Sequence, residues 1–225
     1  MNLPVKAALF DWRGTLVVTI SLSVWVEHAL QRLGRDSSPD AVAGIKVALA
    51  AAVEHPDVQQ TWNRVDESAE VHRETYARLF RVAGLDDDLG EVLYAIESDP
   101  AYNPFADDVP DTLKALNAAG VRVGIVSDIH FDVRPAFADA GLADLVDSFV
   151  LSFEHGVQKP DPRIFRVALD GLAVEPADTL MVGDRASHDG AAVELGIPTV
   201  LVPPLTATSH RRLSVVLRAC GAPTR

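Results

Sequence analysis

The chain has 225 residues, a formal net charge of −12 at pH 7 and 48% hydrophobic residues. This length and apolar content allow a large buried core and exclude an intrinsically disordered protein. The negative charge argues against nucleic acid and anionic membranes as partners. Cys220 is the single cysteine, so no intrachain disulfide is possible. Because there is also no signal-peptide pattern and no apolar run of membrane-spanning length, we expect a cytoplasmic protein.

The first predicted element is a buried strand over residues 6–10, and it ends abruptly in Asp11. An apolar run followed by an acid and a Gly14-Thr15 turn is typical of a parallel strand that delivers a carboxylate to its C-terminal edge. Ligands of open α/β sheets bind at that edge. We therefore predict that Asp11 is a nucleophile. The next β-rich residues, 17–20, predict a short hairpin or flap.

Residues 18–100 have a helical pattern and predict an inserted all-helical domain. Ser38 and Pro39 have the residue types preferred at a helix start, and Gly84 is a plausible helix end. The predicted helices cover about 22–33, a segment from 39 onward, 57–81 and 89–96.

In the remaining sequence, predicted strands alternate with predicted helices. The strands cover about 121–126, 146–151, 180–182 and 199–202, and the helices cover about 108–119, 133–140, a segment from 162 onward, 187–195 and 209–219. Asp108 and Asp161 are predicted caps for two of these helices. The alternation implies right-handed crossovers, and hence an α/β fold with a parallel sheet formed by residues 1–17 and 101–225.

Polar residues lie where these strands end, and we expect four of them to meet at one sheet edge: Asp11, Ser127, Lys159 and Asp184. A carboxylate at Asp11 can attack phosphorus and form an aspartyl-phosphate. Ser127 can donate a hydrogen bond to the phosphoryl group, and Lys159 can offset its charge.

The same edge offers ligands for Mg²⁺, which prefers oxygen donors. The predicted ligands are the carboxylates of Asp11 and Asp184 and the main-chain carbonyl of Arg13, and Asp189 is placed to orient the metal shell or Lys159. Asp128 is a further candidate for substrate contact, although the sequence equally allows an exposed side chain there.

The chain resembles a haloacid dehalogenase superfamily hydrolase with a helical (C1-type) cap. The matching pieces are the stretch 11–15, Ser127, Lys159-Pro160 and Gly183-Asp184 with Asp189. They occur in the family's order and cover the whole chain. The resemblance implies a Rossmann-like core, an aspartyl-enzyme intermediate, substrate contacts near Thr15, and a cap that closes over the substrate and excludes water.

Arg13 departs from the pattern of the family's phosphatases. Those enzymes carry a second aspartate two residues after the nucleophile, which protonates the leaving group and later activates water. An arginine stays protonated and cannot transfer a proton at neutral pH. The loss of a general acid typically costs about 10²–10⁴ in rate. Arg13 is instead a candidate partner for a carboxylate of the cap or for an anionic substrate.

Three readings follow. The first is a Mg²⁺-dependent phosphatase that takes its proton from elsewhere, for example from His130 or His188. The second is hydrolysis of a carbon–phosphorus bond, as in phosphonoacetaldehyde hydrolases, or of a carbon–halogen bond, as in haloacid dehalogenases. Phosphonoacetaldehyde hydrolases need a lysine in the cap, and Lys46 is the one present. Haloacid dehalogenases need no metal, so the presence of Asp184 and Asp189 counts against that reaction. The third is a catalytically weak binding protein.

Of these, the sequence favours the phosphatase, because the predicted nucleophile, lysine and metal-binding acids are all present. We expect Mg²⁺ as cofactor and a small phosphorylated or anionic metabolite as substrate. We expect the protein to be a monomer or a homodimer.

Overall fold

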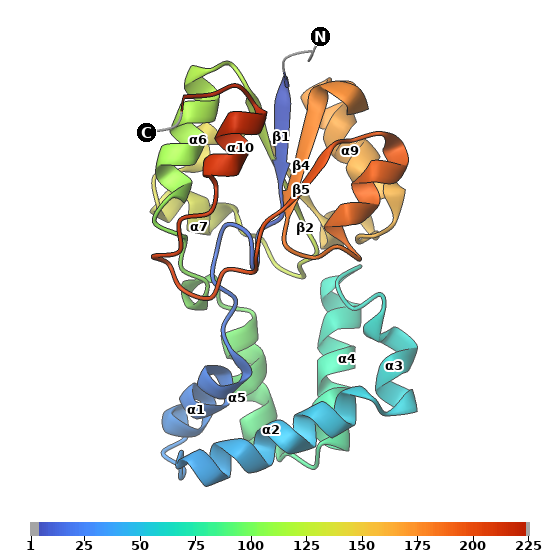
Figure 1. Ribbon diagram of the computed structural model, residues 1–225. Coiled ribbons are helices and arrows are strands. Elements are labelled where there is room, and N and C mark those ends of the chain that lie inside the picture. The colour runs from blue at the N-terminus through green and yellow to red at the C-terminus, as the bar shows by residue number, and fades with distance from the viewer. Residues whose placement is uncertain (1–4, 224–225) are drawn as a thin grey trace.

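The computed structural model describes residues 5–223, and its centre is a five-stranded parallel sheet with the strand order β3-β2-β1-β4-β5 (Figure 1). The strands are β1 (Ala7–Phe10), β2 (Arg122–Ser127), β3 (Ser148–Leu151), β4 (Thr179–Gly183) and β5 (Thr199–Leu201). This confirms the predicted α/β class with a Rossmann-like parallel sheet.

Strand β1 occupies the middle of the sheet and is fully buried. Phe10 is opposite Ile125 of β2 on one side and Val182 of β4 on the other. Because successive side chains of a strand point to opposite faces, Leu9 and Phe10 enter different apolar clusters. The sheet therefore holds the end of β1, and with it Asp11, in a rigid position.

Helices cover both faces of the sheet. α6 (Val109–Ala118), α7 (Arg134–Asp139) and α10 (Ser214–Ala219) lie on one face, and α9 (Pro162–Leu172) lies on the other (Figure 1). Short helices complete the core: α8 (Ser152–His155), η2 (Ala143–Leu145), η3 (Pro176–Asp178) and η4 (Asp189–Leu195). α9 begins as its sequence predicts, because the Asp161 side chain accepts a hydrogen bond from the Arg163 N–H and Pro162 follows it.

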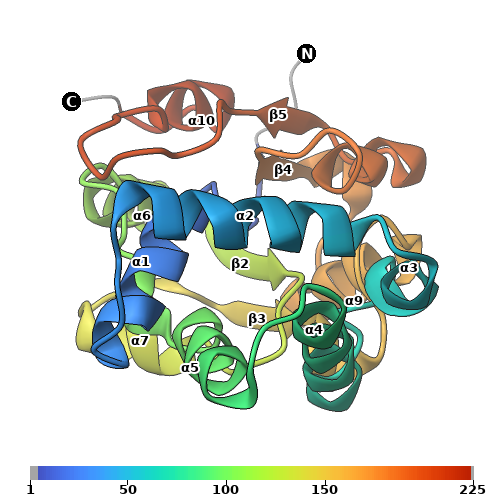
Figure 2. The same cartoon turned by 90° about the horizontal axis from the view of Figure 1, so that it is seen from below.

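A separate helical layer faces the carboxyl ends of the strands (Figures 1 and 2). It contains α1 (Leu22–Arg32), α2 (Pro39–Val53), α3 (Pro56–Trp62), α4 (Ala69–Val82) and α5 (Asp87–Glu97), and the short η1 (Pro100–Tyr102) follows. These helices have an apolar core of their own, in which Val26, Leu79 and Leu93 are almost completely buried. The helical layer thus buries its apolar side chains among its own helices, and polar residues lie between it and the strand ends.

One predicted helix is wrong in its extent. The segment 57–81 is not continuous but forms α3 and α4, with a break at residues 63–68. The break has a local cause, because the Ser68 side chain accepts a hydrogen bond from the Val71 N–H and so caps a new helix. The chain between the two helices turns toward the core, where it contributes to the site described below.

Three further expectations need correction. Asp108 does not cap α6; its carboxylate accepts hydrogen bonds from the main-chain N–H groups of Arg212 and Leu213, so the last helix begins only at Ser214. Residues 189–195 are a 3-10 helix. The predicted hairpin at 17–20 is reduced to isolated bridges of Val17.

Candidate active site

The most deeply buried part of the site is an ion cluster at the end of β1. Lys159 is fully buried, and its Nζ lies 2.6 Å from Asp11 Oδ1 and 2.6 Å from Asp189 Oδ1. Asp11 follows β1 and Asp189 opens η4, so the sheet topology brings residues almost 180 positions apart into one cluster. The lysine therefore bridges the predicted nucleophile and a carboxylate behind it.

Asp184, directly after β4, adds a third carboxylate. Thr15 Oγ1 donates to Asp11 Oδ2 at 3.1 Å and lies 3.5 Å from Asp184 Oδ1. One carboxylate oxygen of each of Asp11, Asp184 and Asp189 lies within 4.8 Å of the others. Gly14 makes this approach possible: its φ is +80°, and a Cβ there would lie 2.5 Å from Asp184 Oδ2. This set of hard oxygen donors fits a divalent cation such as Mg²⁺.

Burial and mutual repulsion shift the pKa values of these groups. Burial raises the pKa of Asp11 to about 6; Lys159 lowers it but does not offset the burial, and Asp189 raises it further. Burial, and then Asp189, raises the pKa of Asp184. Burial alone would lower the pKa of Lys159, yet its carboxylate neighbours, Asp11 first, raise it above the ordinary value. The lysine thus stays charged, and the carboxylates retain a demand for a further cation.

Ser127 and Asp128 have different surroundings. Ser127 is the buried last residue of β2, at the same sheet edge, but it does not line the cavity of the site. Asp128 lines the cavity, and its carboxylate accepts hydrogen bonds from the Lys159 N–H at 2.8 Å and from Arg185 Nη2 at 3.0 Å. Its side chain is only 2% exposed, so the alternative of an exposed residue is wrong. Asp128 holds the loop that carries Lys159.

Arg13 points toward the helical layer. Its Nη1 lies 2.6 Å from Glu97 Oε1, its Nη2 donates to the Glu97 carbonyl oxygen at 2.6 Å, and its Nε donates to Asn103 Oδ1 at 3.4 Å. A carboxylate of the helical layer is thus the partner of Arg13. A general acid is not present at this position.

A cavity of about 620 Å³ lies between the strand ends and the helical layer. The core side includes Asp11, Lys159, Asp184 and Arg185, and the helical side includes Trp62, Asp66, His72, Tyr76 and Glu97. Sequence reasoning missed Arg185, although its place directly after Asp184 is a usable signal. It also missed Asp66 and His72, which no local pattern distinguishes from surface and core residues of a helix.

The structure also places the two candidate proton donors, His130 and His188, and the candidate Schiff-base lysine, Lys46. His188 lines the cavity, whereas His130 and Lys46 do not. Burial first, and then Arg13 and Arg73, lowers the pKa of His130 to about 3, so its ring is neutral. Lys46 Nζ donates to Ser23 Oγ at 2.6 Å, between α2 and the start of α1. A Schiff base on Lys46 therefore does not fit this site.

Comparisons with known proteins agree with this geometry. The family model described as haloacid dehalogenase-like hydrolase matches residues 5–196. The chain is 26% identical over 212 residues to (S)-2-haloacid dehalogenase 1 from Pseudomonas sp. strain CBS-3, covering 88% of this chain and 85% of that protein. It is 29% identical over 205 residues to glyceraldehyde 3-phosphate phosphatase from Methanopyrus kandleri, covering 88% and 84%.

Among solved structures, L-2-haloacid dehalogenase from Xanthobacter autotrophicus superimposes with a TM-score of 0.62 at 25% identity, covering 88% of this chain and 77% of that one. Within residues 5–223, no helix combines the length and the apolar character that a membrane crossing requires. The family match spans most of the chain and includes the strand-end acids, the buried lysine and the helical layer. The chain belongs to the haloacid dehalogenase-like hydrolase family.

Proposed function

We propose that the protein is a Mg²⁺-dependent phosphatase acting on a small phosphorylated metabolite in the cytoplasm, as a monomer or a homodimer. The observation that carries this proposal is the group of Asp11, Asp184 and Asp189, in which Lys159 bridges Asp11 and Asp189. A carboxylate nucleophile that attacks carbon needs no metal, whereas attack on a phosphate requires two anions to approach each other. The retained acids at positions 184 and 189 therefore favour phosphoryl chemistry.

In this proposal, an oxygen of Asp11 attacks phosphorus, the bond to the leaving oxygen breaks, and an aspartyl-phosphate forms. Lys159 and the Thr15 hydroxyl orient the Asp11 carboxylate from two sides. A water molecule then attacks phosphorus, which releases phosphate and restores Asp11. Asp11 and Asp184, with the Arg13 carbonyl, would hold Mg²⁺, which when bound offsets the charge of the two anions.

We further propose that residues 18–100 act as a cap domain on the core formed by 1–17 and 101–225. The support is the separate apolar core of the five helices and the polar cavity between them and the strand ends. A closed cap would exclude water while Asp11 reacts. Arg13 would help to hold the closed position through Glu97, in place of the acid–base role of the missing aspartate.

The test is a screen of phosphorylated metabolites with and without Mg²⁺, read as phosphate release. We expect turnover that requires Mg²⁺ and that is lost in Asp11→Asn. Asp170→Asn, an exposed acid on α9, is the matched control and should be fully active. If no ester or acyl phosphate is hydrolysed, and Asp11→Asn behaves as the wild type does, the proposal fails.

Hydrolysis of a carbon–halogen bond is the second candidate. Two observations favour it: the general acid is replaced by Arg13, and several of the similar proteins are dehalogenases. Halide release from 2-haloacids that is insensitive to chelators would select this reaction. Phosphate release that stops on chelation would select the first.

A further inference from the structure

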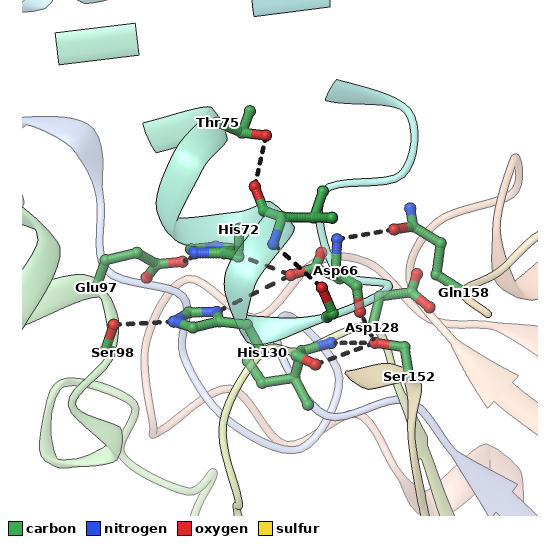
Figure 3. Close-up of polar contacts among 12 residues, drawn as sticks. Asp66, His72, Thr75, Glu97, Ser98, Asp128, His130, Ser152 and Gln158 are labelled. Atoms are coloured by element: carbon green, nitrogen blue, oxygen red, sulfur yellow. Dashed lines mark hydrogen bonds and ion pairs between the residues drawn. The ribbon is translucent and has the colours of Figure 1, made fainter. Parts of the chain in front are cut away.

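A second polar group, here called the cap cluster, consists of Asp66, His72, His130 and Glu97 (Figure 3). Asp66 Oδ1 lies 3.9 Å from His72 Nε2 and 4.0 Å from His130 Nδ1, and His72 Nε2 lies 3.9 Å from Glu97 Oε1. These separations are too long for direct hydrogen bonds. The four side chains converge, and no hydrogen bond joins them to one another at these positions.

The outer atoms of the cap cluster are fixed by other residues. His72 Nδ1 is 3.2 Å from the Tyr94 hydroxyl, and His130 Nε2 is 2.9 Å from Ser98 Oγ. The main chain of Asp66 is also held, because its N–H donates to Gln158 Oε1 at 2.8 Å and its carbonyl accepts from Ser152 Oγ at 2.6 Å. The inward-facing atoms are thus oriented by partners that lie behind them, as in a prepared binding site.

Glu97 Oε1 is bound by Arg13 Nη1 at 2.6 Å, whereas the inward-facing atoms of Asp66 and His130 lack such a partner within residues 5–223. His130 is only 4% exposed, and among residues 5–223 its Nδ1 has no hydrogen-bond partner. The Asp66 carboxylate accepts no hydrogen bond from the same part of the chain. His130 does not line the cavity, whereas Asp66 and His72 do, so the Asp66 carboxylate and His72 Nε2 are the atoms that a ligand in the cavity can satisfy.

The charge at this place favours a cationic donor. Burial lowers the pKa of His72 to about 2 and that of His130 to about 3, so both rings are neutral. Burial, and then the nearby Asp128, raises the pKa of Asp66 to about 7; Arg13 and Arg185 lower it but do not offset the burial. Arg13 is engaged by Glu97. The ring of Tyr76 stacks on His72 with centroids 4.3 Å apart and also on Trp62, so it adds an aromatic wall that holds the His72 ring in place.

The ring geometry distinguishes between two kinds of cation. The rings of His72 and His130 are parallel within 11°, with centroids 3.3 Å apart. The lone pair of an imidazole nitrogen lies in the plane of its ring. Because the two rings are parallel and stacked, their lone pairs point in parallel planes and cannot both be directed at one metal ion. A primary ammonium group carries three N–H donors and can reach an imidazole nitrogen and a carboxylate at once.

We propose that the cap cluster is the subsite for a primary ammonium group on the organic part of the substrate. Asp66 provides the charge contact, and His72 Nε2 accepts a hydrogen bond from the same group in the tautomer whose Nδ1–H donates to the Tyr94 hydroxyl; both residues line the cavity that contains Asp11. The substrate class is then an aminoalkyl phosphate. This assignment rests on the proposed phosphatase function.

The test compares aminopropyl phosphate with butyl phosphate, which has a methyl group in place of the ammonium. We expect kcat/KM to favour the amine by about 10- to 100-fold, the range of a hydrogen bond to a charged group. In Asp66→Asn the ratio should fall toward one. Glu74→Gln, an exposed acid on the same helix layer outside the cavity, should keep the wild-type ratio. Equal kcat/KM values for the two esters in the wild-type enzyme would overturn the assignment.

A binding measurement separates this subsite from the phosphatase proposal. Calorimetry with propylammonium, and with propanol as the uncharged counterpart, needs no turnover. Binding of the amine that is lost in Asp66→Asn supports the subsite even if no phosphate ester is hydrolysed. Binding of neither compound refutes the subsite and leaves the phosphatase proposal untouched. Stoichiometric Zn²⁺ binding abolished by Asp66→Asn would show a metal site and overturn the ammonium assignment.

Discussion

At the scale of single residues, Lys159 balances the buried charge at the end of β1. Replacing it with Met would leave Asp11 and Asp189 without their cation, and such a loss typically costs about 3–5 kcal/mol. The pKa of Asp11 is already raised to about 6, and without the lysine it would rise further. At acid pH the carboxylate is therefore protonated, and the variant no longer carries the cost of an unpaired buried charge. We expect a large stability loss near pH 8 and a smaller one near pH 5, measured by urea unfolding.

Lys6→Met is the control for that experiment. Lys6 also lies 2.6 Å from a carboxylate, that of Asp178, but its side chain is 59% exposed. Exposed ion pairs contribute about 0–1 kcal/mol, so this variant should differ little from the wild type at either pH. An equal loss for Lys159→Met at both pH values would show that packing, and not charge, is what the lysine provides.

Arg13 forms an ion pair with Glu97. For this reason, Arg13→Asp alone is a poor test of whether an acid at position 13 would restore proton transfer. Arg13→Asp places a carboxylate beside Glu97, which loses its partner. The double variant Arg13→Asp with Glu97→Gln removes that repulsion. If the phosphatase proposal holds, the double variant should hydrolyse an alkyl phosphate faster than the wild type does, by up to about 10²–10⁴, the factor that a general acid typically contributes.

Nitrophenyl phosphate is the matched substrate for the Arg13 experiment. Its leaving group needs little protonation, so it should respond much less than the alkyl ester. The same gain with both esters would mean that the double variant acts on binding or cap closure. A double variant no faster than the wild type with the alkyl ester would show that position 13 is not the place from which a proton can be delivered.

At the scale of elements, the break between α3 and α4 fastens the helical layer to the core. Ser152 Oγ donates to the Asp66 carbonyl and accepts from the Ile129 N–H at 2.9 Å. Ser152→Ala should raise amide hydrogen exchange in residues 63–68 and reduce stability by about 1–2 kcal/mol. Ser148→Ala, at the start of β3, is the control. Unchanged exchange at 63–68 would contradict this role of Ser152.

The elements also show where sequence reasoning succeeds and where it stops. The strand ends were predictable because burial patterns locate the strands and parallel topology brings their ends together, as for Asp11 and Asp184. The start of α9 was predictable from the local chemistry of Asp161. The break at 63–68 was missed because the helical spacing of apolar residues continues through it, although Ser68 has a residue type preferred at helix starts and was a usable local signal. Asp66 lies within this break and His72 lies in α4, and both were missed with it.

At the scale of the whole molecule, two apolar clusters around the sheet and a third within the helical layer are joined by polar contacts. The Arg13–Glu97 pair and the main chain of Asp66 are among them. Polar contacts depend on protonation, whereas apolar burial does not. The overall stability of the folded chain should therefore respond to pH through groups at this junction.

Asp66 gives that response a definite sign. Its pKa is about 7 in the folded chain and 3.8 ordinarily, so the folded state binds more protons between these values and loses stability as pH rises through them. The lowered pKa values of His72 and His130 act in the opposite sense, removing stability as pH falls below 6.5. Asp66→Asn removes only the first effect. We expect the free energy of unfolding of this variant to exceed that of the wild type by about 1–3 kcal/mol near pH 8 and to match it near pH 4. Chemical denaturation measures both, with Glu74→Gln as the control. A variant less stable than the wild type near pH 8 would mean that the folded chain already satisfies the charged carboxylate of Asp66, and the need for an ammonium partner there would disappear.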